Sequence, residues 1–204
     1  MDYKMKRLSG MFCALALLLL LSACDAQKKP AAMEIMHADL TKEEQGVFQL
    51  MKEHHAALYD FALEAPAGQI QTQAYRLGDD GAWESVGGGA FALEEKEGRL
   101  ALTFGRLSDG FRTAVQGQGM ISNQNEAHIQ EGPIEESVTT GFAQGPATKI
   151  VWDEEIPLAL QIVAPREIPV SCSTTYYFSP ENLMNQGYEQ VYAVTVMFSK
   201  AGLT

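Results

Sequence analysis

The chain of 204 residues predicts a mainly β protein of the α+β class, an antiparallel β-sandwich of about eight or nine short strands with one N-terminal amphipathic helix. Two observations carry this prediction. From Gly68 onward, apolar residues alternate with polar ones in short runs separated by Gly, Asp, Asn and Pro. Before Gly68, apolar residues between Thr41 and Phe61 recur every three or four positions, which is the spacing of an amphipathic helix.

The predicted helix begins at a capping box, in which Thr41 is followed three residues later by Glu44. Its apolar stripe is formed by Val47, Met51, His54, Leu58 and Phe61. The Pro and Gly of residues 65–68 end it. Adjacent helical residues point about 100° apart and do not face each other, so we expect His54 and His55 to pack rather than to chelate a metal together.

The strands are predicted where the period is two. They cover residues 70–77, 82–86, 90–93, 99–104, 111–116, 148–152, 156–163, 170–178 and 190–198. The pair 99–104 and 111–116 is the clearest hairpin, with Asp109 and Gly110 in its turn. Three glycines at 87–89 are expected to interrupt a strand, whereas the last strand is apolar on both faces and is therefore expected at the centre of a sheet.

Residues 117–145 lack a period and are rich in Gly, Gln, Asn and Glu, with a short strand at 137–142 as the exception. Such a stretch inside a compact domain is either a functional loop or a mobile one. As an alternative, it divides two β halves.

The N-terminus has the layout of a secretory signal: a basic start with Lys4, Lys6 and Arg7, then an apolar run, then small residues. A membrane-spanning helix is the competing interpretation. However, the uncharged stretch from Leu8 to Ala23 has 16 residues, short of the roughly 20 that cross a bilayer.

The residues Leu21, Ser22, Ala23 and Cys24 close this run and resemble the lipobox of bacterial lipoproteins. The resemblance implies that Cys24 is lipidated and becomes the new N-terminus, with Leu21, Ser22 and Ala23 forming the signal-peptidase motif. Three segments are then expected: a signal peptide over 1–23, the lipidated cysteine with a flexible tether over 24–39, and a domain over 40–204. The protein would lie at the bacterial cell membrane, lipid-anchored and facing outside the cytoplasm.

Removal of residues 1–23 leaves 181 residues with a net charge of −13. This acidity argues against nucleic acid as a partner, because binding phosphates needs clustered Lys and Arg. The same negative charge argues against electrostatic binding to anionic lipids or to anionic cell-wall polymers. With Cys24 lipidated, Cys172 is the one cysteine left, so no intramolecular disulfide is expected, and its apolar surroundings favour a buried thiol.

The sequence indicates no catalytic residues, no cofactor and no metal site. Gly-x-Ser-x-Gly, His-Glu-x-x-His, Cys-x-x-Cys and phosphate-loop patterns are missing from it. The acidic groups 79–80, 135–136 and 153–155 lie at predicted turns, where solvated carboxylates are expected. Aromatic residues provide the candidate binding surface: Trp83, next to a turn, and Tyr176 and Tyr177, expected on opposite faces of one strand. Trp152 is expected in the core.

The body contains three characteristic stretches, at 75–77 with 81–83, at 155–158 and at 191–196. In these stretches and in its layout it resembles uncharacterised small lipoproteins of anaerobic Gram-positive bacteria. The resemblance implies no activity. We therefore expect a membrane-anchored, extracytoplasmic, non-catalytic binding module with a protein or glycan partner. A structural or accessory envelope lipoprotein is the alternative, followed by a small hydrolase with dispersed acidic residues.

Overall fold

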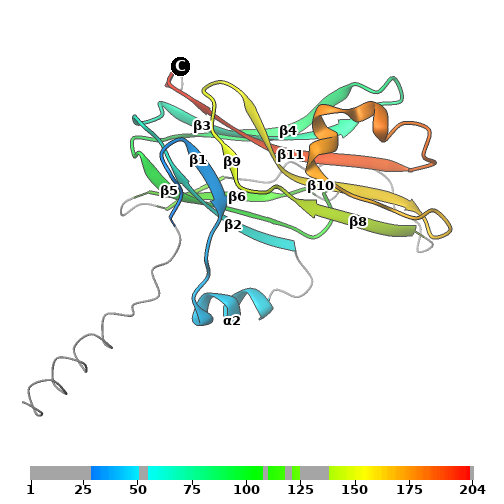
Figure 1. Ribbon diagram of the computed structural model, residues 1–204, viewed down its shortest axis with the longest axis horizontal. Coiled ribbons are helices and arrows are strands. Elements are labelled where there is room, and N and C mark those ends of the chain that lie inside the picture. The colour runs from blue at the N-terminus through cyan, green and yellow to red at the C-terminus, as the bar shows by residue number, and fades with distance from the viewer. Residues whose placement is uncertain (1–28, 51–54, 108–109, 118–120, 125–137, 203–204) are drawn as a thin grey trace, which may run out of the picture.

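The computed structural model describes residues 29–50, 55–107, 110–117, 121–124 and 138–202, which form two antiparallel sheets lying face to face (Figure 1). Sheet A has six strands in the order β7-β6-β5-β2-β1-β9, and sheet B has five in the order β4-β3-β11-β10-β8. The elements are β1 Glu34–His37, α2 Lys42–Leu50, β2 His55–Ala62, β3 Gln69–Leu77, β4 Trp83–Ala92, β5 Glu97–Phe104, β6 Arg112–Gln116, β7 Ile121–Gln124, β8 Val138–Gln144, β9 Thr148–Lys149, β10 Glu155–Pro165, the 3₁₀ helices η2 Thr174–Phe178 and η3 Pro180–Asn182, and β11 Gln190–Ser199. Among the described residues, no helix is both long and apolar enough to cross a membrane. The predicted β-sandwich is confirmed.

The main core lies between the sheets and is filled by alternate residues of the facing strands. Sheet A contributes Tyr59 and Phe61, and sheet B contributes Val196 and Phe198, all 1% exposed or less. The rings of Phe61 and Phe198 lie 5.2 Å apart, centroid to centroid. The Tyr59 hydroxyl donates to the Leu158 carbonyl across the sandwich at 2.8 Å, so the one polar atom of this ring is satisfied inside the core.

The predicted hairpin is confirmed as β5 and β6, which pair antiparallel. Its inward residues are buried on both strands: Leu100, Leu102, Phe104, Thr113 and Val115. The central position of the last strand is also confirmed, because β11 pairs with β3 on one side and β10 on the other. The short strand predicted at 137–142 is matched by β8, except for residue 137, which lies outside the described residues.

The predicted helix is right in its first half and wrong in its second. Its capping box forms: the Thr41 amide donates to Glu44 Oε2 at 2.7 Å, and the Glu44 amide donates to Thr41 Oγ1 at 3.2 Å. Residues 55–62, however, form β2, paired with β1 and β5. Ala57, Tyr59 and Phe61 repeat with a period of two, so this stretch fits both a helix and a strand. Pairing with β1 on one side and β5 on the other selects the strand. His55 begins β2, and His54 lies outside the described residues.

The predicted tether over 24–39 is wrong at its end. Residues 34–37 form β1, which pairs with β2 and β9, and Ile35 is 1% exposed. A strand of four residues carries too short a pattern to be seen in the sequence, and neighbours from distant parts of the chain stabilise it.

The division into two β halves at 117–145 is also wrong. Each sheet contains strands from before and after this stretch, since β3 pairs with β11 in sheet B and β1 pairs with β9 in sheet A. The three glycines at 87–89 do not break a strand either, because β4 continues through them beside β3.

Candidate binding surface

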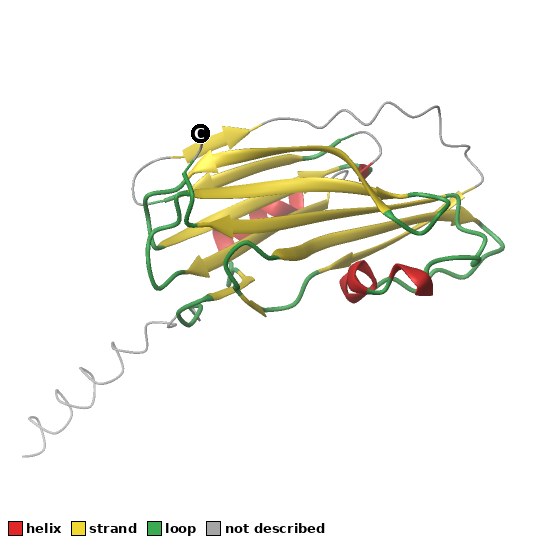
Figure 2. Ribbon diagram, turned by 90° about the horizontal axis from the view of Figure 1, so that it is seen from above, coloured by secondary structure: helices red, strands yellow, loops and turns green. Residues whose placement is uncertain are grey.

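The segment between β10 and β11, residues 166–189, lies over the outer face of sheet B. It carries the two 3₁₀ helices η2 and η3, which lie on the opposite side of the sandwich from α2 (Figures 1 and 2). A second hydrophobic cluster joins this segment to the sheet. Its buried members are Leu160, Ile162, Leu183 and Val191. The sandwich therefore has a covered patch outside its main core, and two of the candidate aromatic residues, Trp83 and Tyr176, pack against it.

Tyr176 and Tyr177 do not lie in a strand, so the prediction that their rings point to opposite faces of one is wrong. They belong to η2, whose N-cap is Ser173 with an extended backbone. The Ser173 hydroxyl accepts a hydrogen bond from the Thr175 amide at 3.3 Å, and such local side-chain bonds compete with strand pairing. Tyr176 consequently packs against the second cluster, whereas Tyr177 contacts Trp83.

Trp83 attaches η2 to the sheet. Its indole stacks on the Tyr177 ring with centroids 5.3 Å apart and planes inclined by 25°. The indole N–H donates to the Tyr177 carbonyl at 2.9 Å. Trp83 is half-buried and packs against the second cluster. The structure therefore brings the three predicted surface residues together, but it uses Trp83 and Tyr176 largely for packing.

The Glu155 carboxylate, on the outer face of sheet B, connects Tyr177 of η2 to the strands beneath it. It accepts hydrogen bonds from the hydroxyls of Tyr75 and Tyr177, and from the Thr195 hydroxyl at 3.2 Å. Burial, and then the hydrogen bond to Glu155, raise the pKa of Tyr75 to about 12 and raise the pKa of Tyr177 well above its ordinary value. Both phenols are therefore protonated donors at neutral pH.

Glu155 was predicted to be a solvated turn residue like its neighbours. Asp153 and Glu154 are indeed exposed, but Glu155 is half-buried as the first residue of β10. The signal was available in the sequence. Glu155 precedes the apolar run of the strand and alternates with buried Ile156, which places its side chain on the outer face of sheet B.

Phe178, which sequence reasoning did not single out, is the exposed part of this surface. The residue is 66% exposed, and its ring packs edge to face against the Tyr177 ring, with centroids 5.5 Å apart. Where burial is described, the other exposed large hydrophobic residues are Val47 and Val151. We call Trp83, Tyr176, Tyr177 and Phe178 the aromatic surface.

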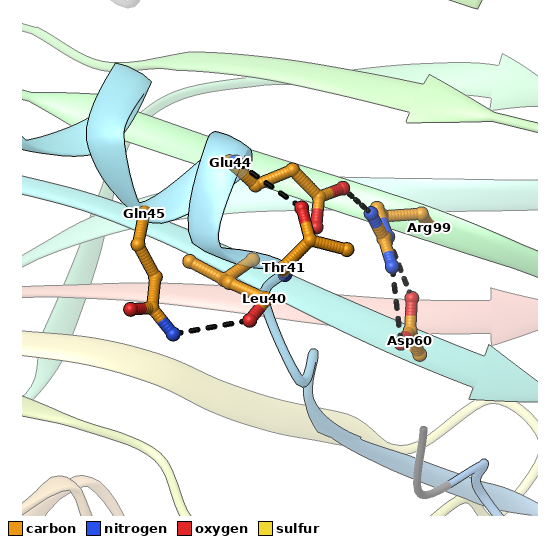
Figure 3. Close-up of polar contacts among 6 residues, drawn as sticks. All are labelled: Leu40, Thr41, Glu44, Gln45, Asp60 and Arg99. Atoms are coloured by element: carbon orange, nitrogen blue, oxygen red, sulfur yellow. Dashed lines mark hydrogen bonds and ion pairs between the residues drawn. The ribbon is translucent and has the colours of Figure 1, made fainter. Parts of the chain in front are cut away.

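A hollow of about 280 Å³ lies beside sheet A, lined by Lys29, Pro30, Asp60 and Arg99 among others. Arg99 donates to Asp60 Oδ1 and to Glu44 Oε1, both at 2.7 Å (Figure 3). The hydrogen bond that Arg99 donates to Asp60 raises the pKa of Arg99, and the hydrogen bond that the Thr41 amide donates lowers the pKa of Glu44. One cation between two carboxylates ties α2 to β2 and β5, which is a structural arrangement.

The remaining candidates take the following positions. Asp79 and Asp80 lie exposed in the β3–β4 turn, where Asp80 Oδ1 accepts from the Ala82 amide at 2.9 Å. Cys172 is half-buried with its thiol 3.3 Å from the Leu160 carbonyl. Trp152 packs against the main core and donates to Glu64 at 3.2 Å. Across the described residues, no group of His, Cys, Asp and Glu could hold a metal ion.

Cys24 and the motif Leu21, Ser22 and Ala23 lie outside the described residues, as do Glu135 and Glu136. Comparison with known proteins returns no family model, no curated protein and no solved structure that matches this chain.

Proposed function

We propose that this protein is a lipid-anchored, extracytoplasmic binding module without catalytic activity, and that its aromatic surface binds a protein partner. The observation that carries the proposal is Phe178, a residue 66% exposed at the end of the short 3₁₀ helix η2, which Trp83 and Glu155 attach to sheet B. Aromatic side chains that enter a partner's pocket supply much of the energy of protein interfaces. A side chain that is already held in place before binding loses less conformational entropy on association.

The geometry favours a protein over a glycan. Stacking of a sugar needs an open, flat aromatic face, whereas the Trp83 indole is stacked against Tyr177 and packed on the second cluster. Phe178 projects from η2 and contacts Tyr177 edge to face. A projecting ring fits a pocket in a folded partner.

The position of the aromatic surface agrees with a lipid anchor. Lys29 and Pro30 line the hollow beside Asp60 and Arg99, so the described chain begins next to sheet A. Phe178 belongs to η2, in the segment 166–189 that packs on the outer face of sheet B, away from the start of the described chain (orange in Figure 1). Cys24 precedes Lys29 by five residues, which span at most about 18 Å. A lipid on Cys24 would keep sheet A near the membrane and leave the aromatic surface accessible.

The test places a photo-crosslinking phenylalanine analogue at position 178 in intact cells, with the same analogue at Val151 as the control. Val151 is also an exposed apolar residue, at 43%, and lies outside the aromatic surface. We expect one protein to be captured from position 178, and its capture to be suppressed by excess wild-type protein but not by excess Phe178→Ala protein.

Equal capture from positions 178 and 151, or equal competition by wild type and Phe178→Ala, would contradict the proposal. Thermal melting of the Phe178→Ala protein controls for folding, and we expect its Tm to be close to wild type because the ring is exposed. Binding of wild-type protein to purified cell-wall glycan, lost in Phe178→Ala, would assign the surface to a glycan instead.

A further inference from the structure

The two sheets end in strands of very different length. Sheet A ends in β7 and in β9, which has two residues, whereas sheet B ends in β8 and in β4, which has ten. Within the described residues, β4 pairs with β3 alone. An edge strand presents a row of backbone N–H and C=O groups to which another strand can pair, and proteins usually shield such edges with charges, prolines or bulges.

The first half of β4 is shielded in this way. The register with β3 shifts between Ala74 and Tyr75, so β4 has a bulge at this point. The Gln73 side chain donates to the Gly87 carbonyl at 2.6 Å and to the Ser85 hydroxyl at 2.5 Å. A charged residue, Glu84, lies in the same half.

The second half of β4, Gly88–Ala92, has none of these features. It contains no charge, no proline and no register shift, and it pairs regularly with residues 69–73 of β3. A side chain cannot be added at Gly88 without displacing its surroundings, since a Cβ there would lie 2.5 Å from the Thr72 carbonyl oxygen. This half is uncharged, and within the described residues it has no strand partner other than β3.

We propose that two copies of this chain pair antiparallel through residues 88–92 of β4 and join their B sheets into one continuous sheet. A twofold axis at Ala90 places Gly88 opposite Ala92 and Gly89 opposite Phe91 of the second copy. An aromatic residue opposite a glycine is a favourable cross-strand pair. The segment pairs with itself without opposing like charges, which is the self-complementarity that a twofold interface requires.

The same symmetry suits the lipid anchor, a point that rests on the proposed function. The twofold axis of an antiparallel strand pair runs perpendicular to the sheet. In both copies, sheet A and the start of the described chain would therefore lie on the same face of the joined B sheets. Two anchors could enter one membrane while both aromatic surfaces face away from it.

The decisive experiment is a charge swap at Ala90, which lies on the twofold axis. We expect purified full-length wild-type protein to have the mass of a dimer in detergent by light scattering, after subtraction of bound detergent. Ala90→Lys alone and Ala90→Glu alone should each weaken dimerisation by more than about tenfold, because like charges face each other. An equimolar mixture of the two variants should restore the dimer.

A monomeric wild type, or a mixture no more dimeric than either variant alone, would overturn the proposal. If the charged variants do not fold, Ala90→Cys in a Cys172→Ser background tests the same contact. Opposed antiparallel residues have Cα atoms about 4.5–5.5 Å apart, within disulfide range. Oxidation should link Ala90→Cys but not Gly46→Cys on α2, and equal linkage would count against the contact.

These measurements concern the mass of the purified protein and use no partner. A dimer with no protein captured from Phe178 would refute the proposed function alone. Capture from Phe178 by a monomer would refute the dimer alone.

Discussion

At the residue scale, Glu155 links four elements through one carboxylate. Its own strand is β10, and its three hydroxyl donors come from β3, η2 and β11: Tyr75, Tyr177 and Thr195. Hydrogen bonds to a charged acceptor are stronger than those between neutral groups. The carboxylate therefore orients Tyr177, and Tyr177 in turn contacts both Trp83 and Phe178.

This arrangement predicts a loss of stability at alkaline pH. The pKa of Tyr75 is raised to about 12 in the folded protein, against about 10 in the unfolded chain. Between these values the folded state keeps a proton that the unfolded state has lost, so the stabilisation is complete below about pH 10 and disappears towards about pH 12. Urea unfolding across this range measures it. The Tyr75→Phe protein should show a smaller loss, and an identical loss in both proteins would contradict the assignment.

At the element scale, Trp83 of β4 is one of the side chains that attach the segment 166–189 to sheet B. We expect Trp83→Ala to lower the free energy of unfolding by about 3 kcal/mol, since it removes the stacked indole and the hydrogen bond to the Tyr177 carbonyl. Hydrogen exchange should show faster opening of residues 174–178 in particular. Trp152→Ala is the matched control, because it removes an indole packed on the other cluster. Equal protection of 174–178 in both variants would show that Trp83 does not hold this segment.

The helix α2 depends on one contact between neighbouring residues and on one contact between residues far apart in the sequence. The Thr41–Glu44 capping box was predicted from residue spacing, and it forms. Glu44 also binds Arg99, which lies 55 residues further along the chain. Spacing along a sequence cannot reveal such a pair, because the pairing of β2 with β5 brings Arg99 beside Asp60 and the helix.

At the scale of the whole molecule, the lipid anchor is a prediction from the N-terminal sequence. We expect Cys24→Ala to leave an unprocessed, unlipidated precursor that carbonate washing releases from the membrane fraction. Two acyl chains give stable anchoring where one gives only marginal binding. Cys172→Ser, which leaves the lipobox intact, should stay membrane-bound. Equal retention of Cys24→Ala and wild type would refute the anchor.

The sequence by itself determined those features that arise between neighbours in the chain. The fold class, the β5–β6 hairpin, the capping box and the central position of β11 follow from alternation, turn residues and apolar content over short windows. These signals hold because the residues that generate each feature lie within a few positions of one another.

Only the tertiary structure decided the rest. Residues 55–62 carry both a helical and a strand period, and pairing with β1 and β5 selects the strand. Residues 174–178 resemble a strand in composition, but they cap sheet B as a 3₁₀ helix and leave Phe178 exposed. The physical reason is common to both: the free energy of burial and pairing depends on partners from distant parts of the chain, which a local pattern does not contain.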